Sequence, residues 1–202
     1  MINLINADCM EVMKDFKDNE FDLAIVDPPY GLDKSSMQGA GKLKHRILNM
    51  SNTDWDIPPK REYFNELFRI SKNQIIWGGN YFIDNLTGTR CFIIWDKKQF
   101  MPTFSACEFA WTSFNKPSKI FTSRGELDKI HPTQKPIKLY EWILENYAKE
   151  GDKILDTHLG SGSIAIACHY AGHDLTGIEI DKEYFDSAKY RIDLMTKQKT
   201  LF

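Results

Sequence analysis

The segment Asp27-Pro28-Pro29-Tyr30 follows directly after an apolar run, Leu23-Ala24-Ile25-Val26. It supplies a carboxylate, a rigid backbone with free carbonyls, and an aromatic ring at one predicted strand end. Asp27 and the Pro28 carbonyl can accept the two protons of a flat exocyclic amine while Tyr30 stacks on its ring. A double proline is also an ordinary turn signal, but the flanking Asp and Tyr favour chemistry. The pattern predicts methylation of a nucleobase amine, with Asp27, Pro28, Pro29 and Tyr30 as catalytic residues.

A second motif, Asp156 to Ser163, links a short apolar strand to a small apolar helix. Its glycines let the backbone approach a ligand closely, and the helix start offers free N–H groups. Glu179 ends the next predicted strand, where a carboxylate can accept ribose hydroxyls. Asp156 suits an ammonium group and would repel a pyrophosphate. The motif therefore favours S-adenosylmethionine over a dinucleotide, although Gly160, Gly162 and Ala165 match the loose G-x-G-x-x-A pattern of an oxidoreductase.

Strand and helix patterns alternate along the chain, which predicts one α/β domain over 1–202 with a doubly wound, mostly parallel sheet. Expected strands are 2–6, 21–27, 74–78, 91–96, 106–112, 153–156 and 174–180. Expected helices begin near Asp8, Pro59, Lys135, Ser161 and Lys182. The strands 91–96 and 106–112 are close in sequence, so we expect an antiparallel hairpin at a sheet edge. Strands 21–27 and 153–156 should be central, which would open both motifs into one crevice.

Composition narrows the class of protein. The chain has 202 residues, 42% hydrophobic residues and a formal net charge of −2, which is typical of a soluble globular domain. No apolar run is long enough to cross a bilayer and no leader opens the chain, so we expect a cytoplasmic protein without membrane contact. The four cysteines form no CxxC pair, and we expect neither disulfides nor a metal site.

The net charge is not that of a strongly basic nucleic-acid binder, but two stretches are locally basic. We interpret 31–58 and 114–129 as target-recognition loops that follow phosphates. Solvated surface loops are the alternative interpretation for each. The predicted DNA-binding residues are Lys34, Lys42, Lys44, Arg46, Lys116, Lys119 and Arg124.

Five segments together resemble the β-group, or permuted, DNA adenine-N6 methyltransferases, a set common in restriction systems and phage genomes. They are Asn6-Ala7-Asp8-Cys9, Asp27 to Tyr30, His131-Pro132-Thr133-Gln134-Lys135-Pro136, Asp156 to Ser163, and Gly177-Ile178-Glu179 with Tyr184, Ala188 and Arg191. The chain departs from the family at Asp156-Thr157-His158, where Asp-Pro-Phe is usual. It is also short for a sequence-specific member, which leaves stringent sequence choice in doubt.

This resemblance implies a seven-stranded Rossmann-like methyltransferase sheet with circularly permuted motif order. It implies methyl transfer from S-adenosylmethionine to the N6 amine of adenine in DNA, with base flipping, and a helix headed by Lys135 that helps seat the cofactor. DNA is then the partner, and a homodimer is one option for the assembly. The predicted cofactor-binding residues are Asp8, Cys9, Asp27, Lys135, Asp156, Thr157, His158, Gly160, Ser161, Gly162, Ser163, Glu179 and Ile180.

Several alternatives stay open at this point. A cytosine-N4 DNA methyltransferase uses the same chemistry, but serine more often replaces the first Asp there. An RNA or protein amide target ranks lower, because such enzymes generally keep the unpermuted order. A non-catalytic, cofactor-dependent DNA-binding subunit is disfavoured by the intact Asp27 and Tyr30. Cytosine-C5 methylation is disfavoured because the chain contains no Pro-Cys dipeptide.

Overall fold

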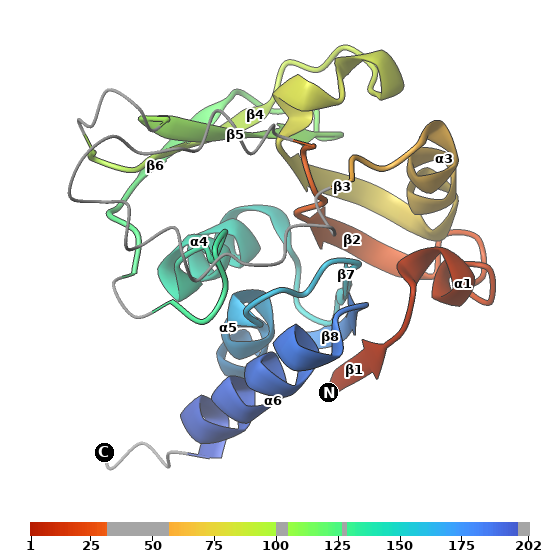
Figure 1. Ribbon diagram of the computed structural model, residues 1–202. Helices are drawn as coiled ribbons and strands as arrows, with labels where there is room; N and C mark the ends of the chain where they lie inside the picture. The colour runs from red at the N-terminus through yellow and green to blue at the C-terminus, as the bar shows by residue number, and fades with distance from the viewer. Residues whose placement is uncertain (32–56, 100–104, 127–128, 198–202) are drawn as a thin grey trace.

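An eight-stranded mixed sheet forms the centre of the computed structural model, which describes residues 1–31, 57–99, 105–126 and 129–197 (Figure 1). The strand order is β1-β8-β7-β2-β3-β5-β4-β6. The strands are β1 (Ile2–Asn6), β2 (Phe21–Val26), β3 (Ser71–Trp77), β4 (Phe92–Asp96), β5 (Cys107–Thr112), β6 (Lys119–Thr122), β7 (Lys153–Asp156) and β8 (Asp174–Glu179). The helices are α1 (Cys9–Met13), α3 (Arg61–Ile70), α4 (Ile137–Tyr147), α5 (Ser163–Ala171) and α6 (Lys182–Lys197), with short 3₁₀ turns η3 (Gly79–Tyr81) and η4 (Ile83–Asn85).

The sheet corrects two expectations. Strands β1, β8, β7, β2 and β3 are mutually parallel, whereas β5 pairs antiparallel with both β3 and β4. The hairpin of β4 and β5 is not at the edge, because β6 pairs in parallel with β4 and covers it. The sheet therefore has eight strands among the described residues rather than seven. The eighth strand, β6, lies within the stretch 114–129, for which the sequence predicts a loop because its largely exposed residues carry no apolar alternation.

Helices cover both faces of the sheet, as the continuous apolar run of β2 requires. Leu23 and Ile25 pack with α4, α5 and α6 on one face. Ala24 and Val26 pack with α3 on the other, in a cluster that also includes Met13 of α1. Figure 1 shows α1 and α3 on one side of the sheet and α4, α5 and α6 on the other. Because β2 is buried on both faces, its near-continuous apolar sequence is the pattern expected for a central parallel strand.

The direction of winding changes between β2 and β7. From β2 the chain passes through α3 to β3, the neighbour of β2 on one side. From β7 it passes through α5 to β8, which lies on the other side of the β2–β7 pair. The two strands are nonetheless neighbours, with Leu23 opposite Ile154 and Ala24 opposite Leu155. The loops that follow them open at the same sheet edge, which is where ligands bind in doubly wound folds.

Neither a membrane span nor a metal cluster is found in the described part of the chain. No helix there is both long and apolar enough to cross a bilayer. No group of three or more His, Cys, Asp or Glu side chains there could hold a metal ion. The four cysteines are free thiols.

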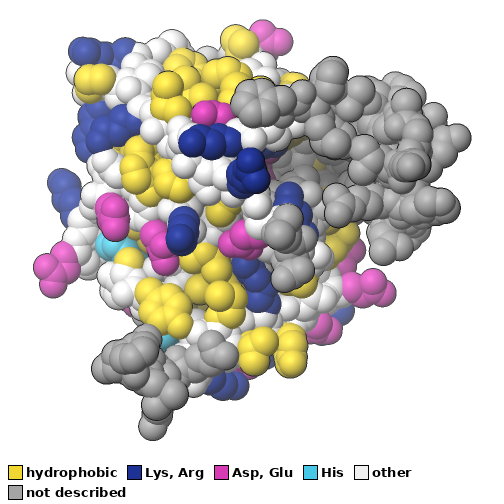
Figure 2. Space-filling view, turned by 90° about the vertical axis from the view of Figure 1, so that its left-hand side faces the viewer, with side chains coloured by type: hydrophobic (Ala, Val, Ile, Leu, Met, Phe, Trp, Pro, Cys, Tyr) yellow, Lys and Arg dark blue, Asp and Glu magenta, His cyan; other side chains and the backbone are white. Residues whose placement is uncertain are grey.

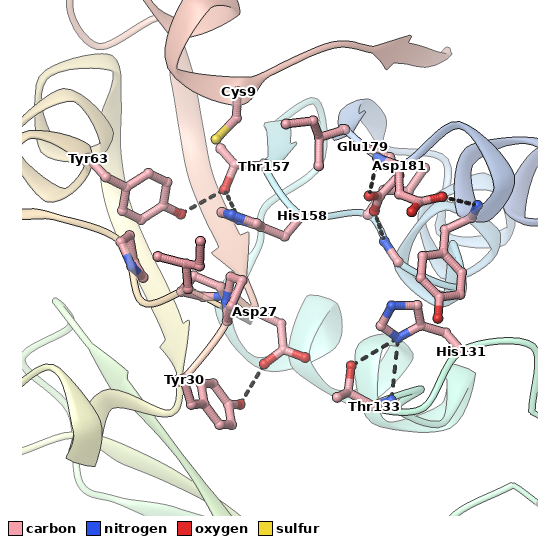
Figure 3. A pocket seen from close by; sticks show the side chains of 18 of the residues that line it. Cys9, Asp27, Tyr30, Tyr63, His131, Thr133, Thr157, His158, Glu179 and Asp181 are labelled. Atoms are coloured by element: carbon pink, nitrogen blue, oxygen red, sulfur yellow. Dashed lines mark hydrogen bonds between the residues drawn. The ribbon is translucent and has the colours of Figure 1, made fainter. Parts of the chain in front are cut away.

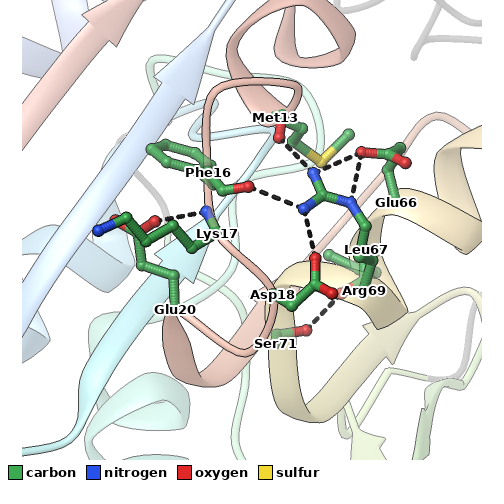
Figure 4. Close-up of polar contacts among 9 residues, drawn as sticks. All are labelled: Met13, Phe16, Lys17, Asp18, Glu20, Glu66, Leu67, Arg69 and Ser71. Carbon is green, nitrogen blue, oxygen red and sulfur yellow. Dashed lines mark hydrogen bonds and ion pairs between the residues drawn. The ribbon is translucent and has the colours of Figure 1, made fainter.

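Arg69, near the end of α3, ties this helix to the end of α1 (Figure 4). Its guanidinium donates hydrogen bonds to the carbonyl oxygens of Met13, at 2.9 Å, and Phe16, at 2.8 Å. It also pairs with Asp18 at 2.8 Å and Glu66 at 2.7 Å. A short helix leaves its last carbonyls without internal partners, and one side chain here satisfies the carbonyls of α1 and its following turn.

We predict that Arg69→Met lowers the free energy of unfolding, because the carbonyls of Met13 and Phe16 lose their donors. Lys72→Met is the matched control, since Lys72 makes an exposed ion pair with Asp22, and such pairs contribute little. Urea unfolding followed by circular dichroism measures both. Equal urea midpoints for the two variants would contradict the conclusion that Arg69 stabilises the end of α1.

Candidate active site

A cavity of about 870 Å³ lies at the edge where β2, β7 and β8 end (Figure 3). Its lining includes the segment from Asp27 to Tyr30 and the turn from Thr157 to Ser161, together with Glu179. The expectation that both sequence motifs open into one crevice is therefore confirmed.

Most of the predicted catalytic and cofactor-binding residues line this cavity, and three do not. Asp156, Gly162 and Ser163 lie outside the lining and are buried. Gly162 precedes α5 with φ +71°, and the Ser163 hydroxyl contacts that of Ser161 at 3.1 Å. The predicted residues that line the cavity are Asp8, Cys9, Asp27, Pro28, Pro29, Tyr30, Lys135, Thr157, His158, Gly160, Ser161, Glu179 and Ile180.

At one end of the cavity, both oxygens of the Asp27 carboxylate already have partners. Oδ1 accepts a hydrogen bond from the Tyr30 hydroxyl at 2.6 Å, and Oδ2 forms an ion pair with Lys135 Nζ. Burial raises the pKa of Asp27, and the Lys135 charge opposes that rise. Burial also works against the charge of Lys135, but Asp27 and Glu108 together raise the pKa of this lysine.

The Tyr30 ring is held in place from the end of β3. Gly78, with φ +68°, lies so close that an added Cβ would come 2.2 Å from Tyr30 Cε1. Tyr81 stacks on the ring with a centroid distance of 4.9 Å and an interplanar angle of 21°. Phe82 meets it edge-on at 6.1 Å. These contacts fix the ring beside Asp27 before any ligand arrives.

At the other end, Glu179 is anchored by backbone donors. Its Oε2 accepts a hydrogen bond from the Gly160 N–H at 2.8 Å, and its Oε1 accepts one from the Asp181 N–H at 3.0 Å. A carboxylate has about four acceptor positions, so two remain for a ligand. Asp181 in turn caps α6 through hydrogen bonds from the N–H groups of Glu183 and Tyr184.

Asp8 and Cys9 form the wall at the start of α1. Asp8 is the N-cap of this helix, and its Oδ1 accepts a hydrogen bond from the Met10 N–H at 2.8 Å. Burial raises the pKa of the Cys9 thiol to about 12, so this side chain is uncharged near neutral pH.

Sequence analysis did not assign a site role to several side chains that line the cavity, including Tyr63, His131, Thr133, Tyr140 and Tyr184. His131 lies in the motif with Lys135, and its ring is 4.4 Å from that of Tyr184. That motif was a usable signal for His131. Tyr63 belongs to the apolar face of α3, so the sequence indicated only core packing.

The histidines of the cavity are neutral near pH 7. Burial lowers the pKa of both His131 and His158 to about 4. His158 Nδ1 lies 2.9 Å from Thr157 Oγ1, which lies 2.7 Å from the Tyr63 hydroxyl (Figure 3). His158 is therefore an uncharged wall residue, held by a chain of hydrogen bonds.

Of the predicted DNA-binding residues, Lys34, Lys42, Lys44 and Arg46 lie outside the described residues. Lys116 Nζ donates to the Asn146 carbonyl oxygen at 3.1 Å, and Lys119 Nζ donates to the Asn146 side chain. Lys119 pairs with Ile93, near the start of β4. Both lysines therefore lie where the parallel strands begin, and the cavity lies where they end.

Arg124 is exposed and follows the end of β6, at the sheet edge where the cavity lies. On the face shown in Figure 2, Lys and Arg side chains are interspersed with acidic and apolar ones rather than gathered in one patch. Arg124, but neither Lys116 nor Lys119, thus lies at the same ends of the strands as the cavity, on the outermost strand of the sheet, and DNA binding by these residues stays a prediction.

Comparisons with known proteins agree on the kind of site. A DNA methylase family of N6 and N4 methyltransferases matches residues 106–190. The type II methyltransferase M.HpaI of Haemophilus parainfluenzae is 25% identical over 232 residues, which cover 94% of this chain and 74% of that protein. The protein in the crystal structure of the M1.HpyAVI–SAM complex has 26% sequence identity to this chain. The two structures match with a TM-score of 0.63 over 95% of this chain and all of that one.

The chain is thus similar to DNA methyltransferases of both the N6 and the N4 type. The cytosine-N4-specific PvuII DNA methyltransferase shares the fold, with 13% identity and a TM-score of 0.66 over 94% of this chain and 86% of its own. The comparisons thus support a DNA methyltransferase, and the complex with SAM supports S-adenosylmethionine as the cofactor.

Asp156 is not among the side chains that line the cavity, and its contact with a ligand ammonium stays a prediction. Its side chain is 2% exposed, and its Oδ1 accepts a hydrogen bond from the His158 N–H at 3.0 Å. The carboxylate is buried, and this hydrogen bond joins it to the bend that follows β7. Burial raises its pKa to about 8, with one opposing hydrogen bond from the backbone.

We predict that folding stability falls with pH because of Asp156. Its pKa in the fold, about 8, lies above its value of about 3.9 in an unfolded chain, so folding favours the protonated form. That stabilisation is complete below about pH 4 and is lost as pH rises through about 8, at up to about 1.4 kcal/mol per pH unit.

Asp156→Asn resembles the protonated group, so its free energy of unfolding should depend less on pH than that of the wild type. Urea unfolding at several pH values in this window measures the difference, and Asp84→Asn, at an exposed position, is the control. A constant gap between wild type and Asp156→Asn across the window would contradict the assignment.

Proposed function

We propose that this protein transfers the methyl group of S-adenosylmethionine to the exocyclic N6 amine of adenine in DNA. The observation that carries the proposal is the shared cavity, with an anchored carboxylate and glycine turn at one end and Asp27-Pro28-Pro29-Tyr30 at the other. A methyl donor and a flat amine need two such subsites facing one another.

The donor end suits a nucleoside with positive charge. The two remaining acceptor positions of Glu179 can bind the ribose hydroxyls, while Cys9 and Ile180 offer apolar surface to the adenine. Asp8, Asp27, Glu179 and Asp181 all line the cavity. This acidic lining attracts a sulfonium and an ammonium and repels a pyrophosphate, which disfavours the dinucleotide-dependent oxidoreductase.

The acceptor end suits an amine whose lone pair is delocalised into a ring. Hydrogen bonds from the amine to Asp27 and to the Pro28 carbonyl favour a pyramidal nitrogen with its lone pair directed at the methyl carbon. Tyr30 stacks on the base after it leaves the duplex, which offsets part of the cost of extrusion.

The transfer is a direct displacement. The N6 nitrogen forms a bond to the methyl carbon while the carbon–sulfur bond breaks, and the electron pair of that bond neutralises the sulfonium as a thioether. The methylated nitrogen then loses one proton, for which Asp27 is the adjacent acceptor. No covalent enzyme intermediate forms, so orientation of the two substrates supplies most of the acceleration.

The finer choice of adenine over cytosine rests on Asp27, where the related cytosine-N4 enzymes more often carry serine. The motif order, with Asp27 before Gly160 in the chain, supports the permuted group. For DNA contact we propose the segment that contains Lys34, Lys42, Lys44 and Arg46, together with Arg124, which lies at the same ends of the strands as the cavity.

Incubation with methyl-labelled S-adenosylmethionine and DNA of mixed sequence, followed by nucleoside mass spectrometry, tests the proposal. We expect label in N6-methyldeoxyadenosine. Label in N4-methyldeoxycytidine would replace the proposal by its closest alternative, and cofactor binding without any labelled nucleoside would favour the non-catalytic subunit.

We predict that Asp27→Ala lowers methyl transfer by about a hundredfold or more, because the amine loses its charged acceptor. Binding of S-adenosylmethionine, measured by calorimetry, should change little, since Glu179 and Gly160 are untouched. A parallel loss of binding and turnover in a folded variant would argue against Asp27 as the amine acceptor.

We predict that Gly78→Ala lowers methyl transfer by about a hundredfold as well, because its Cβ would displace the Tyr30 ring. Gly151→Ala is the matched control: its φ is also positive, at +83°, but nothing lies within 4 Å of an added Cβ. Both variants should lose some stability, and only Gly78→Ala should lose turnover. Equal turnover in the two would show that the Tyr30 position is unimportant.

A further inference from the structure

A row of four side chains with alternating charges runs from the Asp27 end of the cavity to the residue that follows β4. Asp27 pairs with Lys135, Lys135 Nζ lies 3.2 Å from Glu108 Oε2, and Glu108 also pairs with Lys97. The four side chains come from the end of β2, the segment before α4, β5, and the residue after β4. In the middle of the row Lys135 is buried and Glu108 is half-buried, with side chains exposed by 2% and 22%.

Glu108 gives the buried lysine a second partner. The Lys135 ammonium lies 5.0 Å from the centre of the Trp77 ring and has two carboxylates beside it. A buried ammonium with no counter-ion is strongly unfavourable. If Asp27 were its sole carboxylate partner, Lys135 would be bound to that residue throughout the reaction.

In the resting arrangement each oxygen of Asp27 already has one partner. Its Oδ1 accepts a hydrogen bond from the Tyr30 hydroxyl, and its Oδ2 pairs with Lys135. As in Glu179, one acceptor position remains on each oxygen, but the Lys135 charge lowers the pKa of Asp27 and so weakens this carboxylate as an acceptor for an amine. The carboxylate becomes a better acceptor when Lys135 can shift its contact toward another carboxylate. Glu108 is that carboxylate.

We propose that Glu108 is a positioning residue, which shares the Lys135 ammonium so that Asp27 can exchange this contact for the amine of the target base. The inference rests on the proposed role of Asp27 as amine acceptor. Glu108 was not singled out in the sequence, where it is one acid within an apolar strand.

The neighbouring charges determine in which direction the pKa of Asp27 changes when Glu108 is replaced. The Glu108 carboxylate adds to burial in raising the pKa of Asp27, whereas Lys135 lowers it. Burial tends to raise the pKa of Glu108 itself, but Lys135 and Lys97 bring it below its ordinary value, so Glu108 is ionised. The other titratable groups that face Asp27 or these neighbours, among the described residues, include Tyr30, Tyr63, Lys129, His131, Tyr140 and Asp156.

Loss of the Glu108 charge should therefore bind Lys135 more firmly to Asp27 and lower the pKa of Asp27. In Glu108→Gln we expect kcat to fall about tenfold while KM for S-adenosylmethionine stays within about twofold. The acid limb of the pH–kcat profile should move to lower pH. Glu108→Asp keeps the charge and should keep the position of that limb.

The experiment compares the full-length wild type, Glu108→Gln, Glu108→Asp and the control Glu145→Gln, which changes an exposed acid on α4. Steady-state methyl transfer to DNA is measured across the pH range, with thermal unfolding as the check on folding. An unchanged kcat and profile in a folded Glu108→Gln would overturn the proposal, and so would an equal loss of cofactor binding.

A second readout does not depend on turnover. In cofactor-free protein labelled with ¹³C at the Asp side-chain carboxyl carbon, NMR titration follows Asp27, whose resonance is assigned by its absence in Asp27→Asn. We expect Asp27 to titrate at lower pH in Glu108→Gln than in wild type, and an unchanged titration overturns the proposal. Absence of methyl transfer by the wild type would instead overturn the proposed function, and the NMR result would still measure the coupling.

Discussion

The site depends on the parallel pairing of β2 with β7. These strands are more than a hundred residues apart in the chain, yet Leu23 faces Ile154 and Ala24 faces Leu155. Because parallel neighbours end at the same sheet edge, Asp27 and the Thr157–Ser161 turn open into one cavity. The apolar sequence of β2 buries it on both faces, and this burial fixes the pairing from which the remaining geometry follows.

The positions of Asp27 and Glu179 could be predicted because Asp27 directly follows a strand, β2, and Glu179 is the last residue of another, β8. A parallel sheet brings such strand ends together whatever the details of packing. The inward turn of Asp156 could not be predicted in the same way, although it too ends a strand. Its orientation depends on a hydrogen bond from the His158 N–H, and sequence periodicity carries no information on which way a side chain turns within a bend.

The eighth strand and Glu108 escaped prediction for a related reason. β6 has only four residues, Lys119–Thr122, with little burial, so backbone pairing with β4 rather than an apolar pattern defines it. Glu108 lies within a predicted strand, but its partners Lys97 and Lys135 come from other segments. An acid inside an apolar strand is itself a signal, since burying a charge is unfavourable unless a counter-ion is nearby.

The two carboxylates at the ends of the cavity differ in what holds them, and the difference matches their proposed tasks. Glu179 is bound by backbone N–H groups of Gly160 and Asp181, which cannot move away without changing the fold. Asp27 is bound by the side chains of Tyr30 and Lys135, which can. A cofactor site gains from a fixed acceptor, because orientation is then paid for during folding. The acceptor of an amine that must enter, react and leave needs partners that can change their contacts. Lys135 can do so because Glu108 offers its ammonium a second carboxylate.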